Sequence, residues 1–395
     1  MTFDAHLHRA VDALTRDALL RTPRVHEAAH APELLIHGAR LINLCSNDYL
    51  GFASDPAIAR SAADALLEHG LGAGSARLVT GTHALHRRAE ARLARFTAKA
   101  SALLFSTGYA ANVGAVQALV GKDDVIFSDA LNHASLIDGA RLSRARVIIY
   151  RHGDPEHLAE LLAAQRAQHG VALVITESLF SMDGDTAPLR ELRALCDRYD
   201  AGLYVDEAHA IGVLGPSGRG LCAELSVHAD VLMAGLGKAF GCTGAFIAGS
   251  ADLTTLLENR ARSFVFSTAA PPALAAAALT ACDLVEQADD RRARLRANAI
   301  HLREQLTTFG YHVLPGSGPI IPAIIGAPDA VMALSRSLFE RGVFVQGIRP
   351  PTVPTGTSRL RITPIATQSE AQLARALDAF GALRPTDAFV PPSHG

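Results

Sequence analysis

Short apolar runs alternate with amphipathic segments through the middle of the chain. Between residues 100 and 250, seven runs of mostly β-branched, aromatic and small apolar residues have the length of buried strands: ALLF, DVIF, RVIIY, ALVIT, GLYVD, DVLMA and AFIAG. Segments with helical spacing separate several of these runs. Strands that alternate with helices predict an α/β fold, in which a mostly parallel sheet is covered by helices on both faces. Ligands of such sheets bind at the carboxyl ends of the strands.

Two of the intervening segments carry clear helix signals. In DPEHLAELLAAQ, Asp154 is placed to cap the N-terminus, Pro155 lies in the first turn, and leucines fall on one face at positions 158, 161 and 162. The segment PLRELRALCDRY has an apolar stripe at helical spacing, formed by Leu189, Leu192, Leu195 and Tyr199. Both segments are therefore predicted to be helices that pack an apolar face against the sheet.

The pattern changes after Cys282. Residues 283–306, DLVEQADDRRARLRANAIHLREQL, predict one long charged helix. Beyond it, IIPAIIGA, VFVQGI and SRLRITP predict strands, DAVMALSRSLFERG predicts a helix, and Ser369 with Gln372 predicts a capping box. We expect a helical and β segment over residues 1–45, a large α/β domain over 46–283 and a small α+β domain over 284–395. The tail TDAFVPPSHG is expected to be loosely ordered.

Composition narrows the class of protein. The chain has 395 residues, 49% hydrophobic and 19% charged, with a net charge of −2 and no basic run, which argues against a nucleic-acid or membrane partner. The five cysteines are widely spaced, and no histidine or cysteine pattern has metal-ligand spacing, so we expect reduced thiols and no metal. The N-terminus lacks the apolar core of a secretion signal. These features predict a soluble, cytoplasmic enzyme.

The stretch YVDEAHAIGVLG contains the letters DEAH at Asp206–His209, a tetrapeptide of nucleic-acid-dependent ATPases. Such an ATPase needs a phosphate loop in which Gly-Lys is followed by Ser or Thr. The two Gly-Lys pairs here, Gly121-Lys122 and Gly237-Lys238, are followed by Asp and Ala. The ATPase interpretation is therefore rejected.

The glycine-rich stretch GLGKAFG, Gly235–Gly241, is similar to a dinucleotide-binding turn, but no acidic residue follows on a second strand about twenty positions later. Lys238 within it follows a buried strand, and a partly desolvated lysine in such a place is suited to Schiff-base chemistry. Asp206 ends the strand GLYVD and His209 follows it. Pyridoxal 5′-phosphate (PLP) needs a lysine that bonds it covalently and a carboxylate that pairs with its ring nitrogen, and Lys238 and Asp206 would meet both needs.

A phosphate site is indicated by FSTGYAAN, Phe105–Asn112, which has the pattern of a strand, a turn and a helix start. The backbone amides of Gly108 and Tyr109 would lie at the helix N-terminus, where anions bind. Each of these features alone is also compatible with a solvated lysine, a solvated aspartate or an ordinary turn. Their combination in an alternating α/β chain favours PLP.

With these motifs the chain resembles the α-oxoamine synthases, which are fold-type I PLP enzymes, from Leu41 to Phe380. The matching stretches, in the family's order, are SNDYLG, GAGSARLVTG, FSTGYAAN, SDALNHASLIDG, ESLFSMDGDTAPL, VDEAHAIGVLGPSGRG, GKAFG, FSTAAPP and IRPPTVPTGTSRLRIT. Two of them, FSMDGD and IRPPTVP, favour the branch that serves biotin biosynthesis. The resemblance implies a large domain with a mostly parallel central sheet, a smaller α+β C-terminal domain and a homodimer.

The resemblance also implies roles for individual residues. Lys238 would bond PLP covalently and move the proton at the substrate's Cα, and Asp206 would pair with the ring nitrogen. His133 would stack on the ring and position the substrate, while His209 would contact the ring oxygen. Further cofactor contacts would come from Gly108, Tyr109 and Ser181, and from Thr268, in a segment that the family uses to reach the partner's cofactor.

The substrate residues follow in the same way. Asn47 and Arg361 match positions that hold the carboxylate of the amino acid, with Arg359 as a second candidate for that role. Arg21, Arg349 and Thr352 match positions that receive the acyl substrate. One position departs from the family pattern: Gly235 stands where a threonine usually donates its hydroxyl to the phosphate, so we expect weaker retention of PLP.

The resemblance implies an acyltransferase that condenses L-alanine with pimeloyl-CoA or pimeloyl-acyl carrier protein. The products would be carbon dioxide, the free thiol and 8-amino-7-oxononanoate. A sister activity that joins glycine or serine to another acyl-CoA stays open, as in glycine C-acetyltransferase, 5-aminolevulinate synthase or serine palmitoyltransferase. A relative that keeps the fold without the cofactor is a second alternative, against which the intact Lys238, Asp206 and His133 argue.

Overall fold

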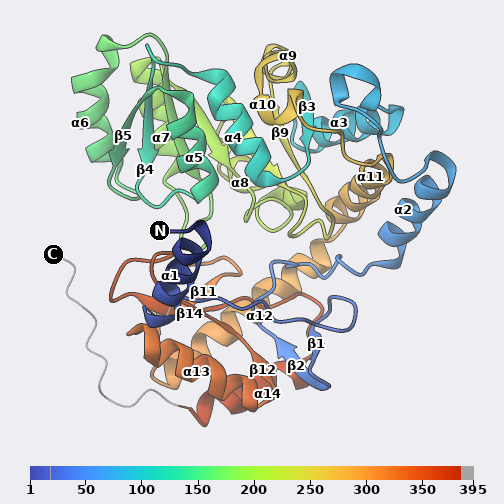
Figure 1. Cartoon of the computed structure of the whole chain (residues 1–395), viewed down its shortest axis with the longest axis vertical. Helices are drawn as coiled ribbons and strands as arrows, with labels where there is room; N and C mark the ends of the chain where they lie inside the picture. Colours follow the sequence, from blue (N-terminus) through green and yellow to red (C-terminus); the bar gives the residue numbers. More distant parts are fainter. Residues whose placement is uncertain (18, 384–395) are drawn as a thin grey trace.

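A computed structural model describes residues 1–17 and 19–383, so the tail expected to be loosely ordered lies outside the described residues. Its main feature is a sheet in the order β3-β9-β8-β7-β6-β4-β5 (Figure 1). Among the described residues of this sheet, β9 runs in the direction opposite to the other six strands. Its strands coincide with the seven predicted runs: β3 Ser101–Phe105, β4 Val125–Asp129, β5 Arg146–Tyr150, β6 Ala172–Glu177, β7 Gly202–Asp206, β8 Val231–Gly235 and β9 Ala245–Gly249. The predicted α/β sheet is confirmed.

Helices cover both faces of this sheet because its buried strands are apolar on both sides. Along β7, Leu203 and Val205 pack into one core and Tyr204 into the other. The first core includes side chains of α3 Ala84–Phe96, α6 Pro155–Gln165, α7 Leu189–Tyr199, α8 Leu221–Leu225 and α11 Pro272–Glu286. The second includes side chains of α4 Gly108–Leu119, α5 Ala134–Ser143, α9 Ala251–Arg260 and α10 Arg262–Val265. Both α6, capped by the Asp154 side chain at the His157 amide, and α7 are confirmed as helices.

The expected single helix over residues 283–306 is wrong. The chain forms two helices there, because α11 ends at Glu286 and α12, Asp289–Thr308, begins after a break at Gln287 and Ala288. The buried guanidinium of Arg292 donates to the carbonyl of Val285 at 2.6 Å, which satisfies the end of α11. Two aspartates in the first turn of α12 favour a new N-terminus at that point.

A second unit lies beside the large sheet (Figure 1). A four-stranded sheet has the order β10-β11-β14-β13, with bounds His312–Val313, Ile321–Gly326, Ser358–Ile362 and Gln346–Ile348. It packs with α12, α13 Pro328–Glu340 and α14 Glu370–Gly381, and the Ser369–Gln372 capping box of α14 is confirmed. The run VFVQGI is divided between β12, Val343–Phe344, and β13.

The N-terminal strands join this second unit. The strands β1 Glu33–Ile36 and β2 Ala39–Asn43 form a hairpin, and β2 pairs in parallel with β12. The helices α1 Phe3–Arg16 and α2 Pro56–His69 flank this segment in the sequence. Ile42 and Leu44 therefore lie in the same core as α12 and α14, although the division of the chain at residues 45 and 283 stays a prediction.

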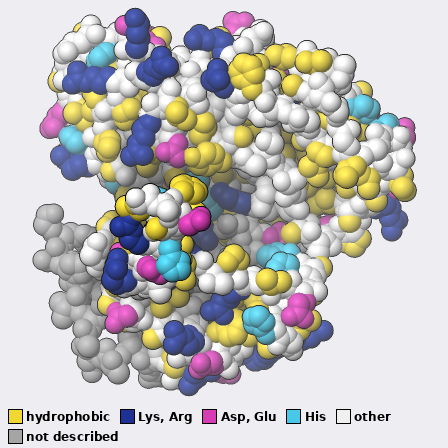
Figure 2. Space-filling model, in the orientation of Figure 1, with side chains coloured by type: hydrophobic (Ala, Val, Ile, Leu, Met, Phe, Trp, Pro, Cys, Tyr) yellow, Lys and Arg dark blue, Asp and Glu magenta, His cyan; other side chains and the backbone are white. Residues whose placement is uncertain are grey.

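The surface has mixed chemistry on the face drawn in Figure 2, where Lys and Arg side chains are scattered among acidic and apolar ones. The molecule is hollowed between its two units on this face. Within residues 1–17 and 19–383, every helix is too short or too polar to cross a membrane.

Candidate active site

Three neighbouring strands of the large sheet end around one cavity of about 350 Å³. The ends are Glu177 on β6, Asp206 on β7 and Gly235 on β8, and Lys238 follows three residues after β8. The cavity is lined by seven of the residues predicted for the site: Asn47, Gly108, Tyr109, His133, Asp206, His209 and Lys238. These positions span nearly two hundred residues of sequence, and the parallel sheet brings them to one edge.

Lys238 is the amine of this cavity. Its Nζ lies 2.9 Å from Nε2 of His209. Burial lowers the pKa of Lys238 to about 8, while Asp206 and then Glu177 act in the opposite direction. The amine therefore loses its proton more readily than an ordinary lysine, as a nucleophilic lysine requires.

Asp206 is held by a buried network. Its carboxylate accepts hydrogen bonds from Asn112 Nδ2 at 2.7 Å and from the amide of Ala208 at 2.9 Å. The orientation of Asn112 is fixed because its carbonyl oxygen accepts from the hydroxyl of Tyr204 at 2.7 Å. Asn112 also donates to Ser135 Oγ at 2.9 Å. Sequence reasoning missed Asn112 as a site residue, although it ends the FSTGYAAN motif.

His133 caps α5 and lines the same cavity. Its Nδ1 accepts from the backbone amide of Ser135 at 3.2 Å and lies 2.8 Å from the Ser135 hydroxyl. Burial lowers the pKa of His133, the charge of Asp206 opposes this, and Lys238 reinforces it. With Nδ1 occupied as an acceptor, the neutral ring carries its proton on Nε2.

His209 joins the lysine to the second unit of the fold. Its Nδ1 lies 2.7 Å from the hydroxyl of Tyr49, and burial, followed by the charges of Lys238 and Arg361, lowers the pKa of His209 well below its ordinary value. The Tyr49 hydroxyl accepts from Arg361 at 3.5 Å and donates to Asn47 Oδ1 at 3.3 Å. Arg361 also donates to Asn47 Oδ1 at 3.1 Å. A continuous chain of polar contacts thus runs from Lys238 to Arg361, and Tyr49 within it was missed from the sequence.

The N-terminus of α4 faces the cavity through Thr107, Gly108 and Tyr109. Thr107 caps the helix by accepting from the amide of Ala110 at 3.0 Å, which leaves the first amides of the helix for a ligand. Gly235 lies across the same cavity. A Cβ placed on Gly235 would meet only the Ala208 side chain within 4 Å, at 3.6 Å, so the missing threonine leaves open space.

The predicted acyl residues form a separate cluster. Arg21 donates to the Thr352 hydroxyl at 3.3 Å, and Arg349 donates to the carbonyl of Leu20 at 3.1 Å. This brings Arg21, Arg349 and Thr352 together between the N-terminal segment and the loop before β14, but none of them lines the cavity of Lys238. Ser181 does not line it either.

The loop that carries Ser181 contacts both arginines of β14. The carbonyl of Ser181 accepts from Arg361 Nε. Arg359 is paired with Asp183 at 2.6 Å and is therefore occupied. The acceptors of Arg361 are neutral groups of Ser181, Asn47 and Tyr49, so its charge is available to a ligand anion, although Arg361 itself does not line the cavity of Lys238.

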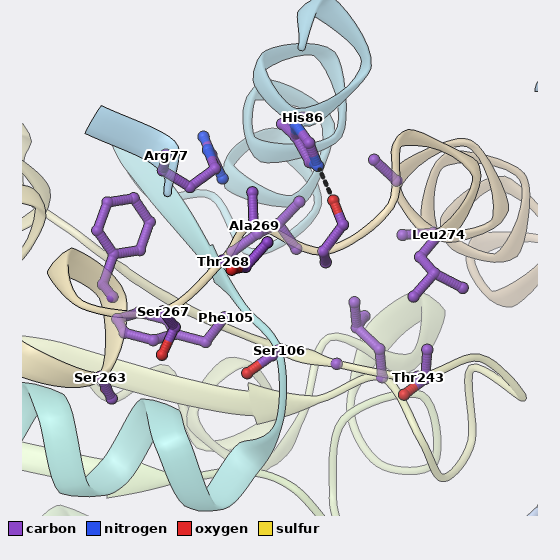
Figure 3. A pocket seen from close by; sticks show the side chains of 17 residues that line it. Arg77, His86, Phe105, Ser106, Thr243, Ser263, Ser267, Thr268, Ala269 and Leu274 are labelled. Carbon is purple, nitrogen blue, oxygen red and sulfur yellow. Dashed lines mark hydrogen bonds between the residues drawn. The ribbon is translucent and has the colours of Figure 1, made fainter. Parts of the chain in front are cut away.

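Thr268 lies in an adjoining cavity, shown in Figure 3 with Ser267 and Thr243. Thr243 and Gly244 line both cavities, so the two are neighbours. Within one chain the structure does not bring Thr268 to the cavity of Lys238. In the described part of the chain, no group of three or more His, Cys, Asp or Glu side chains could hold a metal ion.

Comparisons with known proteins agree with this architecture. The sequence profile described as aminotransferase class I and II matches residues 39–380. The 8-amino-7-oxononanoate synthase of Anaeromyxobacter dehalogenans is 50% identical over 377 residues, covering 95% of this chain and 94% of its own. That of Geobacter sulfurreducens is 47% identical over 371 residues, covering 93% and 95%. A serine palmitoyltransferase variant from S. paucimobilis with a bound PLP–myriocin adduct superposes with a TM-score of 0.90 at 29% identity, covering 95% and 96%. The resemblance and the fold-type I architecture are confirmed.

Proposed function

Since the chain belongs to the class I and II aminotransferase family, we propose that it is a PLP-dependent acyltransferase that joins L-alanine to a pimeloyl thioester. The products are 8-amino-7-oxononanoate, carbon dioxide and the free thiol, and the pathway served is biotin biosynthesis. The observation that carries the chemistry is Lys238 in one cavity with the buried carboxylate of Asp206 and the ring of His133. The identity of 47–50% to two synthases of that name supports the choice of substrates.

The residues of the cavity fit PLP. They supply an amine, a carboxylate fixed by two donors, a neutral imidazole and a helix N-terminus, in a volume typical of small-molecule sites. When bound, PLP supplies an electron sink for negative charge at the Cα of an amino acid. Lys238 would hold it covalently, and Asp206 would keep the proton on its ring nitrogen. His133, His209 and the amides of Gly108 and Tyr109 would contact its ring, oxygen and phosphate.

The amino acid is held by its carboxylate. Arg361 donates a hydrogen bond to Asn47, and Asn47 lines the cavity. A guanidinium group with an amide beside it suits a planar anion. Lys238, once exchanged for the substrate amine, removes the proton at Cα and later returns one there. Nζ of Lys238 contacts His209, and this contact orients the amine.

The acyl thioester is received by Arg21, Arg349 and Thr352. Two guanidinium groups beside a hydroxyl can bind the free carboxylate of a pimeloyl chain or the phosphates of its carrier. This cluster does not distinguish pimeloyl-CoA from pimeloyl-acyl carrier protein.

The working unit is a homodimer. Three large apolar side chains near Thr268 are more than half exposed, namely Leu78, Val79 and Phe266. Ala76 forms a bridge with Thr268, so these residues belong to one surface. Covering it with a second copy would bury the apolar side chains and would bring Thr268 to the partner's cofactor.

A serine palmitoyltransferase-type reaction is the second candidate, because structures of that enzyme superpose so closely. The test is an absorption spectrum of the protein with PLP, before and after addition of L-alanine, glycine or L-serine, repeated with Lys238→Ala. We expect a visible band that borohydride fixes to Lys238, the largest response with L-alanine, and carbon dioxide release with pimeloyl thioester. A dominant response to serine or glycine would support a sister enzyme, and the absence of any band would leave a cofactor-free relative.

A further inference from the structure

We propose that Glu177 is a further ligand-binding residue of the site, a buried carboxylic acid that keeps its proton and donates a hydrogen bond to an anionic oxygen of the bound ligand. This inference rests on the proposed function, because it needs a ligand in the cavity of Lys238. Glu177 is the first residue of the ESLFSMDGDTAPL stretch, and the family resemblance implies no role for it.

Glu177 and Asp206 are direct neighbours at the edge of the sheet. Glu177 ends β6, Asp206 ends β7, and the two are register partners in a parallel pair. Register partners point to the same side of a sheet, and both residues line the same cavity. They are 3% and 5% exposed. Two buried carboxyl groups in this arrangement cannot both be ionised without a large electrostatic cost.

Hydrogen bonding and burial together favour one of the two carboxyl groups as the site of the charge. Asp206 accepts two well-formed bonds, from Asn112 and Ala208, and such donors favour an ionised carboxylate. Glu177 Oε1 is enclosed and has no hydrogen-bond partner among the described residues. An ionised carboxylate with an unpaired buried oxygen is the more costly of the two. The negative charge therefore belongs to Asp206 and the proton to Glu177.

The charged and titratable groups around Glu177 agree with this assignment. Burial raises the pKa of Glu177 to about 8, and Asp206 on β7 adds to the effect. Lys238, after β8, opposes it, as do the backbone amides of His133 at the start of α5 and of Ser181 in the following loop. The cavity then holds one cation, Lys238, one anion, Asp206, and one neutral acid at neutral pH.

Because Glu177 lines the cavity of Lys238, its acid O–H group is placed to meet a ligand bound there. Two anionic oxygens are available in the proposed reaction. One is the phenolic oxygen of PLP, and the other is the thioester carbonyl oxygen, on which negative charge develops as the carbon–carbon bond forms. Both accept a hydrogen bond from an O–H donor without any proton transfer.

Infrared difference spectroscopy tests the protonation without relying on activity. In the PLP-free protein we expect a carboxylic acid carbonyl band that disappears in Glu177→Gln and that fades as the pH rises through about 8. A shift of the band on addition of PLP alone would show that the oxygen that accepts from Glu177 belongs to the cofactor. A shift only after the pimeloyl thioester is added assigns it to the acyl group. No Glu177-dependent acid band near neutral pH, or a band that neither ligand moves, overturns the proposal.

Activity of the loaded enzyme gives a second readout. Glu177→Gln keeps a neutral hydrogen-bond donor, so we expect kcat and PLP affinity within about tenfold of the original. Glu177→Ala removes the donor and should lose at least a further tenfold in one of these quantities. Equal behaviour of the two variants contradicts a donor role.

Glu207 provides a matched control. It is fully buried and adjacent in sequence to Asp206, but it accepts from the amides of Leu221 and Cys222 and does not line the cavity. Glu207→Gln should leave the ligand-induced band shift in place, provided that far-UV circular dichroism reports a folded protein. If PLP gives a visible band with Lys238 while the infrared result is negative, Glu177 alone is misassigned. If no visible band forms, the proposed function fails first.

Discussion

The hydroxyl of Tyr49 lies 2.7 Å from Nδ1 of His209, although 160 positions separate the two residues. Tyr49 precedes the large sheet in the sequence, and His209 follows its central strand β7. Their contact connects the lysine end of the cavity with the Arg361 and Asn47 end. The substrate's carboxylate and the reactive amine would therefore be held by one continuous polar network.

Replacing Tyr49 tests that network. Tyr49→Phe leaves Nδ1 of His209 without its partner in a buried place, so we expect a loss of about 1–3 kcal/mol in the free energy of unfolding. We also expect the KM for L-alanine to rise severalfold, since Arg361 and Asn47 lose a shared contact. Urea unfolding and steady-state kinetics measure the two effects. An unchanged KM would show that Tyr49 only supports the fold.

The orientation of Asp206 depends on Asn112. Asn112→Ala removes a 2.7 Å hydrogen bond to a buried carboxylate, a bond worth about 1.5–3 kcal/mol, so PLP affinity should fall about tenfold or more. A PLP titration followed by absorbance measures the change. Gln117→Ala, on the same helix but outside this cavity, is the control. Equal PLP affinity in both variants would contradict the role given to Asn112.

Gly235 leaves space at the position where the family resemblance implies a threonine hydroxyl. Gly235→Thr should increase PLP affinity severalfold, because the nearest atom to the new Cβ is 3.6 Å away and the hydroxyl adds a donor beside the phosphate site. The dissociation constant of PLP is the measurement. If it does not change, the expected weak retention of PLP has another origin or does not exist.

A pH-dependent contact supports the loop that carries Ser181. His152 lies 2.8 Å from Asp129 and 2.8 Å from Asp185, and Asp185 belongs to that loop. Burial disfavours the charged ring, but the two carboxylates raise the pKa of His152 to about 10. The folded pKa is above the ordinary value of 6.5, so the stabilisation is complete below about pH 6.5 and disappears as the pH rises through about 10.

His152→Gln should therefore destabilise the protein by about 1–2 kcal/mol at pH near 6, after allowance for solvent screening, and by little at pH near 10. Urea unfolding of both proteins at the two pH values measures this difference. His301→Gln, which changes an exposed histidine on α12, is the control and should leave the free energy of unfolding unchanged. A destabilisation by His152→Gln that is equal at both pH values would point to lost packing against Phe180 instead.

The sequence predicts those structural elements that depend on residues close together along the chain. All seven strands of the large sheet, the Asp154 cap and the Ser369–Gln372 box follow from local patterns, and they appear in the structure. Lys238 and Asp206 could be paired in advance because parallel strands end at one edge, whereas the role of His133 was implied only by the family resemblance. The break between α11 and α12 could not be predicted, because it depends on a hydrogen bond from Arg292 to the carbonyl of Val285.

The missed site residues have the same cause. No local pattern marks a chemical role for Tyr49, Asn112 or Glu177. Each is brought to the site by contacts with residues far away in the sequence. Glu177 in particular is notable only beside Asp206, with an oxygen that no neighbour satisfies.

The pairing of β2 with β12 has a consequence for how the chain is made. Ile42 lies opposite Val343, so the first strands leave the ribosome about three hundred residues before their partner exists. At about 5–20 residues per second, the edge of β2 stays open for roughly 15 to 60 s. The strands of the large sheet lie within residues 101–249 and can assemble during that interval. During synthesis the outer edge of the hairpin is therefore unpaired, and chaperones or neighbouring chains can bind to it.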